Sequence, residues 1–309
     1  MRTLVVGAGA TGGFYGGRLA QIGRDVTFLV RQRRAEQIRD GLHIVSPLGD
    51  ATIRPTLLTA EKLRARPQTF DLIVLATKAY SLEQAIDAFA PGVGPETAIL
   101  PLLNGMRQLD LLDARFGAEH VIGGTCRINS DVDAEGHVLQ LSTLGDLTFG
   151  ERSSERTPRV ERIHAELSGA LFNAVLSDDV LAAMWHKWYV LASLNSICIL
   201  PRGSVGEVVA VPHGVAFANA AIDECIAIAV ANGYPPPIKL VEADRKRLTL
   251  PGSDLTSSMY RDMVKGALVE ADHVLGDLLA RAEAHGVAAP LLRAAYVQLK
   301  VYEQHRSRG

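Results

Sequence analysis

Three closely spaced glycines, Gly7, Gly9 and Gly12, follow a short apolar run at the start of the chain. The other positions of this GAGATG segment hold small residues, Ala8, Ala10 and Thr11. Where a strand turns into a helix, the first glycine permits the tight turn and the second lets backbone amides approach a pyrophosphate. The third lets helix and strand pack closely. The alternative is an ordinary flexible turn, but the strand before it and the helix after it favour binding of a nicotinamide dinucleotide.

The end of the next predicted strand, DVTFLV, is followed by Arg31 rather than by a carboxylate. A carboxylate at this position would hold the ribose hydroxyl of NAD, whereas arginine accommodates the additional phosphate of NADP. Arg33 and Arg34 come next, so that a phosphate would meet several planar guanidinium groups. The alternative is a solvated basic loop. Because Asp and Glu are absent from the strand end, we predict NADPH/NADP as the cofactor.

Two polar residues, Lys78 and Asn104, follow the predicted strands DLIVLAT and AIL. Open α/β sheets bind their ligands at the carboxyl ends of strands, and this position favours a binding role for both residues. Spacing alone leaves two structural alternatives open. Lys78 is also compatible with an exposed helix start, and Asn104 with an ordinary Asn-Gly turn.

The order of the predicted elements indicates an α/β protein with two domains. Up to about residue 150, short β-branched runs alternate with helical stretches, as in a parallel, doubly wound sheet. The runs VIGGTCRI, GHVLQL and LTFGE predict added strands of the same sheet, with a turn from Asp133 to Gly136. From Val180 onward, apolar residues recur every three or four residues and predict helices. We expect a Rossmann-type domain over residues 1–177 and an all-helical domain over residues 178–309.

Composition narrows the classes of partner. Lys plus Arg (32) nearly balance Asp plus Glu (34), which argues against nucleic acid or an anionic membrane as a partner. The apolar stretch from His213 to Asn232 contains Asp223 and Glu224, so it predicts a buried helix rather than a membrane span. Three scattered cysteines lack the spacing of a metal site, and no export signal is recognisable. We expect a cytoplasmic protein without a metal, and the apolar helical faces are compatible with a homodimer.

A series of short motifs along the chain resembles the ketopantoate reductase (2-dehydropantoate 2-reductase) family. The motifs are GAGATG, TKAY, LLNGM, MWHKW, SLNS, SSMYRD and the tail EADHVLGDLLARAEAHG, and they span nearly the whole chain. The resemblance implies that NADPH reduces a 2-keto acid held in the cleft between the two domains. The most specific expectation is reduction of ketopantoate to pantoate in pantothenate biosynthesis.

The resemblance also assigns roles to individual residues. It makes Lys187 the catalytic lysine, whose ammonium donates a proton as negative charge develops on the carbonyl oxygen. Without the resemblance, Lys187 would be interpreted as a surface residue, and His186 would be the more obvious acid. Glu270 corresponds to a glutamate near the cofactor and the lysine, where a carboxylate keeps the ammonium charged. The roles implied for the remaining positions are cofactor binding at Lys78, cofactor and substrate binding at Asn104, and substrate binding at Asn195 and Ser258.

Helical geometry adds expectations for these positions. Asn195 lies eight residues after Lys187, so the two are within about 80° of each other around a helix. Between them Leu191 stands where the family usually has asparagine, which reduces the specificity expected for ketopantoate. On one straight helix, Ser258 and Glu270 would be about 120° and about 18 Å apart. Ser258 is also compatible with a role in capping the start of a helix.

Two alternatives to ketopantoate reduction remain open at this point. The first is an NADPH-dependent reductase of another keto or hydroxy acid, which Leu191 favours. The second is a non-catalytic NADP-sensing protein, because a fold does not determine a function. Retention of all four residues that the resemblance assigns to the helical domain argues against the sensor, namely Lys187, Asn195, Ser258 and Glu270.

Overall fold

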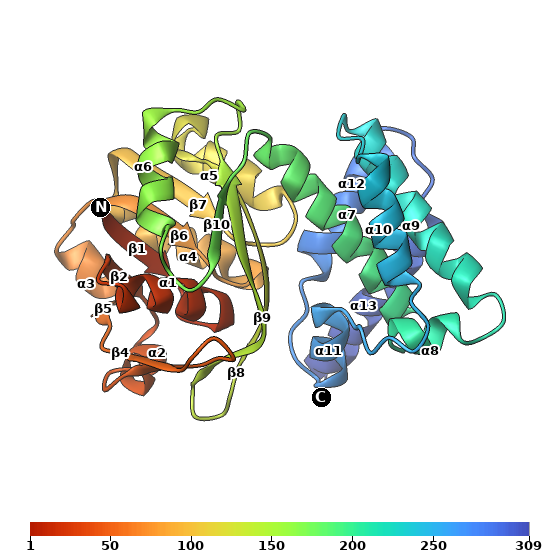
Figure 1. Cartoon of the computed structure of the whole chain (residues 1–309), viewed down its shortest axis with the longest axis horizontal. Coiled ribbons are helices and arrows are strands. Elements are labelled where there is room, and N and C mark those ends of the chain that lie inside the picture. The colour runs from red at the N-terminus through yellow and green to blue at the C-terminus, as the bar shows by residue number, and fades with distance from the viewer. Residues whose placement is uncertain (309) are drawn as a thin grey trace. The chain divides into compact units, whose positions relative to one another are not determined.

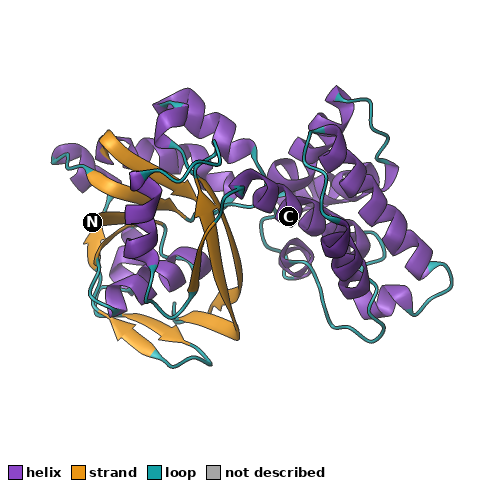
Figure 2. Cartoon of the chain, turned by 45° about the horizontal axis from the view of Figure 1, so that its top comes forward, coloured by secondary structure: helices purple, strands orange, loops and turns teal. Residues whose placement is uncertain are grey.

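The computed structural model describes residues 1–308, which form two compact units (Figure 1). Unit 1 comprises Met1–Leu103 and Gln108–Ala183. Unit 2 comprises Asn104–Arg107 and the chain from Met184 onward. Every strand in the described part of the chain belongs to unit 1, and unit 2 is helical (Figure 2). A Rossmann-like fold followed by a helical domain is therefore confirmed, with one short loop of the N-terminal half packed in unit 2.

A parallel sheet of five strands forms the core of unit 1. Its strands, in order across the sheet, are β5 (Thr56–Leu58), β2 (Asp25–Leu29), β1 (Arg2–Val6), β6 (Phe70–Leu75) and β7 (Val93–Pro101). From β1 the chain continues to β2 on one side and later to β6 on the other. The carboxyl ends of β1 and β6 therefore lie at a topological switch point, where sheets of this kind bind ligands.

The later strands of unit 1 form a second sheet. The long hairpin β8 (Gly123–Val132) and β9 (Val138–Gly150) is joined by β3 (Leu42–Val45), β4 (Ala51–Ile53) and β10 (Asn173–Leu176). The predicted turn is present, because the amide of Gly136 donates to the carbonyl of Asp133 at 3.1 Å. The prediction that these runs extend the parallel sheet holds only at the start of the first run, where Val121 forms an isolated parallel bridge with Ile99 of β7. It was wrong for the strands β8 and β9 themselves. In addition, GHVLQL and LTFGE are parts of one strand, β9.

Helix α1 (Ala10–Gln21) explains why there are two sheets. It is buried from Gly12 to Leu19 and contacts strands of both sheets. A Cβ atom added to Gly16 would come within 2.7 Å of Phe28 in the parallel sheet, and one added to Gly13 within 2.7 Å of Val138 in the second sheet. Because the glycines let α1 approach both layers, the second sheet packs on the far side of the helix instead of at the edge of the first.

The other helices of unit 1 connect the strands. They are α2 (Gln32–Gln37), α3 (Ala60–Ala65), α4 (Leu82–Phe89), α5 (Arg107–Phe116) and α6 (Pro158–Leu167). Thr157 caps α6 by accepting a hydrogen bond from the amide of Val160, and Pro158 occupies the first helical position, where an amide would lack a partner in the helix.

Unit 2 consists of helices that pack on one another. They are α7 (Val180–Ile199), α8 (Val205–Val209), α9 (Gly214–Ala231), α10 (Ile238–Leu248), α11 (Ser258–Val264), α12 (Asp277–Ala284) and α13 (Pro290–Arg308). The first turn of α7, up to Ala183, belongs to unit 1. A short π-helix, Asp272–Gly276, precedes α12. Helix α9 is long and apolar enough to cross a membrane by those criteria alone. It packs against α12 and α13, however, and its Glu224 accepts hydrogen bonds from the amides of Leu291 and Leu292, so α9 is a core helix of this unit.

The chain is not one straight helix between Ser258 and Glu270. Helix α11 ends at Val264, and Gly266 follows with a φ of +71°. The amide of Gly266 donates to the carbonyl of Met263, and the next amide donates back to the carbonyl of Asp262. This pair of hydrogen bonds is the Schellman motif that ends many helices at a glycine. Ser258 and Glu270 therefore do not share one straight helix, and the separation expected for that case does not apply.

The three cysteines, Cys126, Cys198 and Cys225, are buried free thiols. Burial raises the pKa of Cys198 to about 11 and that of Cys225 to about 12. Both thiols are therefore protonated at neutral pH and pack as small apolar side chains.

Candidate active site

The glycine-rich turn lies between β1 and α1. Gly7 has a φ of +94°, a conformation that favours glycine, and a Cβ atom added to Gly12 would overlap the carbonyl oxygen of Gly7. Gly9 is exposed, and a Cβ atom added there would meet no protein atom within 4 Å. The first-turn amides of α1 point out of the helix with the positive end of its dipole. The turn thus has the open face and the amides that a bound pyrophosphate requires.

Thr77, which follows β6, faces this turn. The methyl group of Thr77 is 3.3 Å from the position of a Cβ atom on Gly7. Its hydroxyl oxygen is buried and has no hydrogen-bond partner within residues 1–308. A buried polar atom of this kind is normally satisfied by water or a ligand, which fits a dinucleotide at the switch point. Lys78 is exposed at the start of the following turn.

Arg31 connects the ends of two strands of the parallel sheet. It precedes α2 and is exposed, and its Nη2 donates to Ser81 Oγ at 3.0 Å and to Gln84 Oε1 at 3.2 Å. Ser81 and Gln84 follow β6, so the guanidinium spans from the end of β2 to the start of α4. Sequence reasoning missed these two partners, because they lie some fifty residues from Arg31.

Arg34 has a different environment from the one that we expected of a phosphate-binding side chain. Its Nε donates to the carbonyl of Ala8 in the glycine-rich turn, and its Nη1 donates to the carbonyl of Gly136 in the β8–β9 turn, both at 2.9 Å. Burial lowers the pKa of this guanidinium. Arg34 therefore ties the glycine-rich turn to the β8–β9 turn, whereas Arg31 and Arg33 are exposed. A role of these arginines in phosphate binding stays a prediction.

In unit 2, helix α7 carries Lys187, Leu191 and Asn195 on one face, because they are four residues apart. Lys187 and Leu191 are half-buried, and Asn195 is 4% exposed. The Nδ2 of Asn195 donates to the carbonyl of Leu191 at 2.8 Å. Its Oδ1 is buried and has no partner among the described residues. Along this face of α7, a cation (Lys187), an apolar side chain (Leu191) and a hydrogen-bond acceptor (Asn195 Oδ1) therefore follow one another.

His186, the alternative acid, is paired with a buried carboxylate. Its Nε2 lies 2.8 Å from Oδ2 of Asp244 on α10, and the hydroxyl of Tyr189 donates to the same oxygen at 2.7 Å. Burial alone would raise the pKa of Asp244, but these two hydrogen bonds and the charge of Arg247 lower it. The pair holds α7 against α10, which is a structural use of the imidazole.

The Asn104–Arg107 loop packs against the π-helix that follows Glu270. Gly105 has a φ of +84°, and a Cβ atom added to it would be 3.0 Å from the carbonyl oxygen of His273. Trp188, next to the candidate lysine, donates its indole N–H to the carbonyl of Val274 at 2.8 Å. The segments that carry Asn104, Lys187 and Glu270 are thus joined within unit 2 through their immediate neighbours.

The two serines at the start of α11, Ser257 and Ser258, have different positions and roles. Ser257 is the capping residue, and its hydroxyl accepts a hydrogen bond from the amide of Tyr260 at 3.0 Å. Its backbone is also hydrogen-bonded to the thiol of Cys198 near the end of α7. Ser258 occupies the first helical position and is exposed. The capping role that we considered for Ser258 is therefore performed by Ser257.

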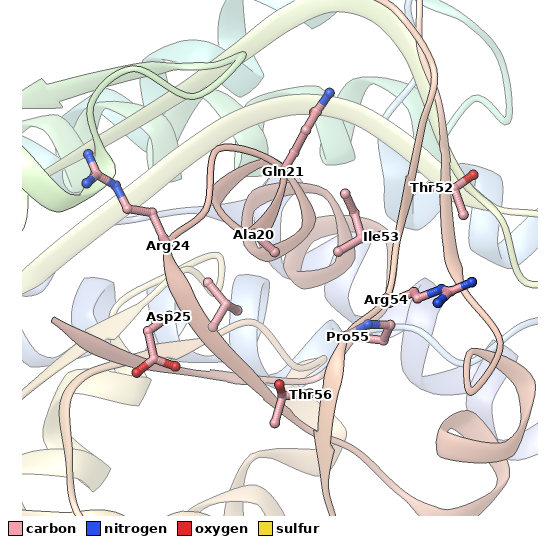
Figure 3. A pocket seen from close by; sticks show the side chains of 10 residues that line it. Ala20, Gln21, Arg24, Asp25, Thr52, Ile53, Arg54, Pro55 and Thr56 are labelled. Atoms are coloured by element: carbon pink, nitrogen blue, oxygen red, sulfur yellow. The ribbon is translucent and has the colours of Figure 1, made fainter.

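A separate hollow of about 390 Å³ lies in unit 1 (Figure 3). It is lined by the end of α1, the beginning of β2 and the β4–β5 connection, so it is at the amino end of β2, away from the glycine-rich turn. Arg24 and Arg54 point to opposite sides of it. Arg24 is bound to the carbonyl of Ala165. The hollow has no set of side chains that converge on one ligand atom.

Comparison with known proteins agrees with this arrangement. Residues 3–154 match the family model described as ketopantoate reductase PanE/ApbA, and residues 179–303 match the model of its C-terminal domain. The chain belongs to the ketopantoate reductase family. It is therefore an oxidoreductase that acts on CH–OH groups, as the resemblance of its motifs had implied.

Individual relatives cover most of the chain. The uncharacterized oxidoreductase YkpB of Bacillus subtilis is 36% identical over 307 residues, 99% of this chain and 100% of that protein. The 2-dehydropantoate 2-reductase of Mesorhizobium japonicum is 29% identical over 296 residues, 88% of each chain. The crystal structure of 2-dehydropantoate 2-reductase from Geobacter metallireducens has a TM-score of 0.87 at 28% identity, and the match covers 97% of this chain and 99% of that chain.

The candidate residues of this ketopantoate reductase family member fall into two groups. Unit 1 contains the glycine-rich turn, Arg31 and Lys78. Unit 2 contains the candidate residues of the Asn104 loop and of the helices. The second group comprises Asn104, Lys187, Asn195, Ser258 and Glu270. Their roles in catalysis and in binding stay predictions.

Proposed function

We propose that this chain reduces a branched 2-keto acid with NADPH, and that its preferred reaction is ketopantoate to pantoate, a step of pantothenate biosynthesis. The observation that carries the proposal is the face of α7, on which Lys187, Leu191 and the unpartnered Oδ1 of Asn195 follow one another. Ketopantoate carries a keto oxygen, two methyl groups and a hydroxyl, and each of these suits one of the three side chains.

The proposed proton donor is Lys187. Its ammonium would hydrogen-bond the keto oxygen and donate a proton as negative charge develops there, which stabilises the transition state more than the ground state. The Glu270 carboxylate would keep this ammonium charged. Asn195 Oδ1 would accept a hydrogen bond from the substrate's hydroxyl group, and Leu191 would contact the substrate's methyl groups.

NADPH, when bound, supplies the hydride. The open face above Gly9 and the buried hydroxyl of Thr77 support a dinucleotide at the switch point. The choice of NADPH over NADH rests on Arg31, which presents a cation at the strand end where NAD-specific proteins have a carboxylate. Ser81 and Gln84 would orient its guanidinium for the additional phosphate. Lys78, exposed after β6, would contact the cofactor on the same side of the sheet.

A different keto acid is the second candidate substrate, and Leu191 is the specific observation in its favour. Leucine removes a polar group from the face of α7, and burial of a polar substrate group beside it would leave that group without a partner. A keto acid with a larger apolar substituent and no hydroxyl would fit Leu191 but would leave Asn195 Oδ1 unsatisfied.

The test is NADPH oxidation by the full chain with ketopantoate, 2-ketoisovalerate, pyruvate and phenylglyoxylate, with NADH as the alternative cofactor. We expect the highest kcat/KM with ketopantoate and NADPH, and little activity in Lys187→Ala. A higher kcat/KM with a keto acid that lacks the hydroxyl would favour the second candidate. Tight NADPH binding without turnover of any acid would contradict both and favour an NADP-sensing protein.

A further inference from the structure

His273 is a buried histidine beside the candidate active-site residues. It is 6% exposed and lies in the π-helix, three residues after Glu270. Its imidazole is hydrogen-bonded to the backbone of Asn104, a residue far away in the sequence. Short π-helices are rare and occur frequently at functional sites, because the extra residue redirects the side chains around it.

Gly105 of the Asn104 loop lies close to both the backbone and the ring of His273. A Cβ atom added to Gly105 would be 3.0 Å from the carbonyl oxygen of His273 and 3.6 Å from its ring Cδ2. Only glycine permits this approach, since Gly105 also has a positive φ. The imidazole and the Asn104–Gly105 turn therefore form one packed unit.

The same π-helix is tied to Glu270 and to α7. The amide of Val274 donates to the carbonyl of Glu270 at 3.0 Å, and the carbonyl of Val274 accepts the indole N–H of Trp188 at 2.8 Å. Trp188 is fully buried and adjoins Lys187. His273 and Val274 are thus consecutive residues that hold, respectively, the Asn104 loop and the helix that carries the candidate lysine.

The ring is suited to a fixed neutral hydrogen bond. Burial lowers the pKa of His273, the nearby Glu270 raises it in part, and Arg107 lowers it further. Hydrogen bonding to the Asn104 backbone also raises it. At neutral pH the ring therefore carries one N–H, which the Asn104 carbonyl is placed to accept.

We infer that His273 is a positioning residue, which holds the Asn104 loop in register with Glu270 and Lys187 for the reduction of the keto group. This inference rests on the proposed function, because His273 itself contacts neither substrate nor cofactor in it. His273 acts through the residues to which the proposed function gives those contacts. Misplacement of such groups by about 1 Å reduces turnover by about 100-fold.

Three substitutions separate positioning from simple packing. His273→Phe keeps a ring but removes the N–H, and we expect kcat to fall about 10- to 100-fold, with a smaller change in KM. His273→Asn and His273→Gln place an amide N–H near the two ring nitrogens. We expect the better of the two to restore kcat to within about 5-fold of the wild type, because it restores the hydrogen bond to Asn104.

Glu224→Gln is the matched control for loss of stability. It weakens the hydrogen bonds at the start of α13, in the same unit but outside this network. We expect a lower Tm with unchanged kcat. If His273→Phe keeps the wild-type kcat, or if neither amide variant recovers any activity, the positioning role is wrong.

Hydrogen–deuterium exchange distinguishes failure of this inference from failure of the proposed function. We expect faster exchange in the peptides that contain Asn104–Arg107 and residues 270–276 in His273→Phe, and slower exchange again in the better amide variant. Glu224→Gln should leave both peptides unchanged. A wild-type chain that reduces no keto acid would contradict the proposed function, whereas unchanged exchange in His273→Phe would contradict the inference.

Discussion

Lys187 and His186 are neighbours on α7 with different surroundings. Consecutive residues of a helix are about 100° apart, so the two side chains leave the helix in different directions. His186 meets the buried Asp244, whereas Lys187 shares its face with Leu191 and Asn195. Residue type alone favours His186 as the acid. The position on the helix favours Lys187, because it lies on the same face as Leu191 and Asn195.

Substitution of Lys187 tests this distinction. We expect Lys187→Ala to lower kcat about 100-fold or more with NADPH affinity largely unchanged, because a general acid is lost. The comparison is His186→Gln, which should lower Tm and leave most of the activity. Steady-state kinetics and NADPH titration measure both effects. The reverse pattern would assign the proton transfer to His186.

Arg31 offers a test of cofactor choice at the same scale. We expect Arg31→Asp to lower kcat/KM for NADPH at least about 10-fold more than for NADH, since it removes charge-assisted hydrogen bonds to the phosphate. Arg33→Asp has the same change in charge two residues away and controls for the general electrostatic field. Equal losses with the two cofactors, or equal losses in the two variants, would exclude Arg31 from phosphate recognition.

Among the elements, α1 combines two uses of glycine. Gly9 faces open space at its start, where a ligand would approach, and Gly16 faces Phe28 in the core. Four glycines in TGGFYGG are unusual for a helix, because glycine destabilises a helix interior by about 1 kcal/mol relative to alanine. Close packing between two sheets compensates for this loss.

The two glycines should therefore respond in opposite ways to a larger side chain. We expect Gly16→Val to lower the free energy of unfolding by about 1–3 kcal/mol, because Phe28 and the backbone have to move. Gly9→Val should leave the free energy of unfolding nearly unchanged and weaken NADPH binding. Denaturant unfolding and NADPH titration of both variants check this contrast. Loss of stability in Gly9→Val would mean that the turn, and not the ligand, requires glycine.

At the scale of the whole molecule, each unit contains a buried carboxylate that is stabilised in its charged form. Glu151 in unit 1 accepts hydrogen bonds from Thr157 and Arg159, and Asp244 in unit 2 accepts them from His186 and Tyr189. Burial opposes the charge, but these partners lower both pKa values in the folded state. A carboxylate with a lowered folded-state pKa stabilises the folded protein at pH values above its unfolded-state pKa. This stabilisation is lost as the pH falls through the folded-state pKa.

We expect the Tm of the protein to fall as the pH decreases below about 4, near the pKa of an unfolded Asp or Glu. Asp244→Asn should lower the Tm at pH 7 and reduce its dependence on pH in the acid range. Asp87→Asn, an exposed aspartate of α4, is the control. Calorimetry from pH 3 to 7 measures the slopes. An unchanged slope in Asp244→Asn would contradict the role of this carboxylate.

Cytoplasmic location and a homodimer also stay predictions at this scale. Exposed apolar side chains on α13, Val297 at 53% and Val301 at 41%, are one turn apart and belong to the helical unit to which the dimer prediction refers. Light scattering of the purified chain determines its oligomeric state, and a monomer at micromolar concentration would contradict the homodimer.

The sequence alone determined the elements whose signals are local. The GAGATG turn, the strands through Val6, Leu29 and Leu75, and the helices after Val180 were predictable because side-chain periodicity and glycine positions depend on neighbours in the chain.

Only the tertiary structure decided which distant segments meet. It placed β8 and β9 in a second sheet because α1 packs between the layers, and it gave Arg31 and Arg34 different partners although both are arginines of one basic run. It also joined the Asn104 loop to His273, which no local pattern indicated. Such pairings depend on packing between residues far apart in the chain, and hydrophobic periodicity carries no information about which partner a buried face or a polar side chain will find.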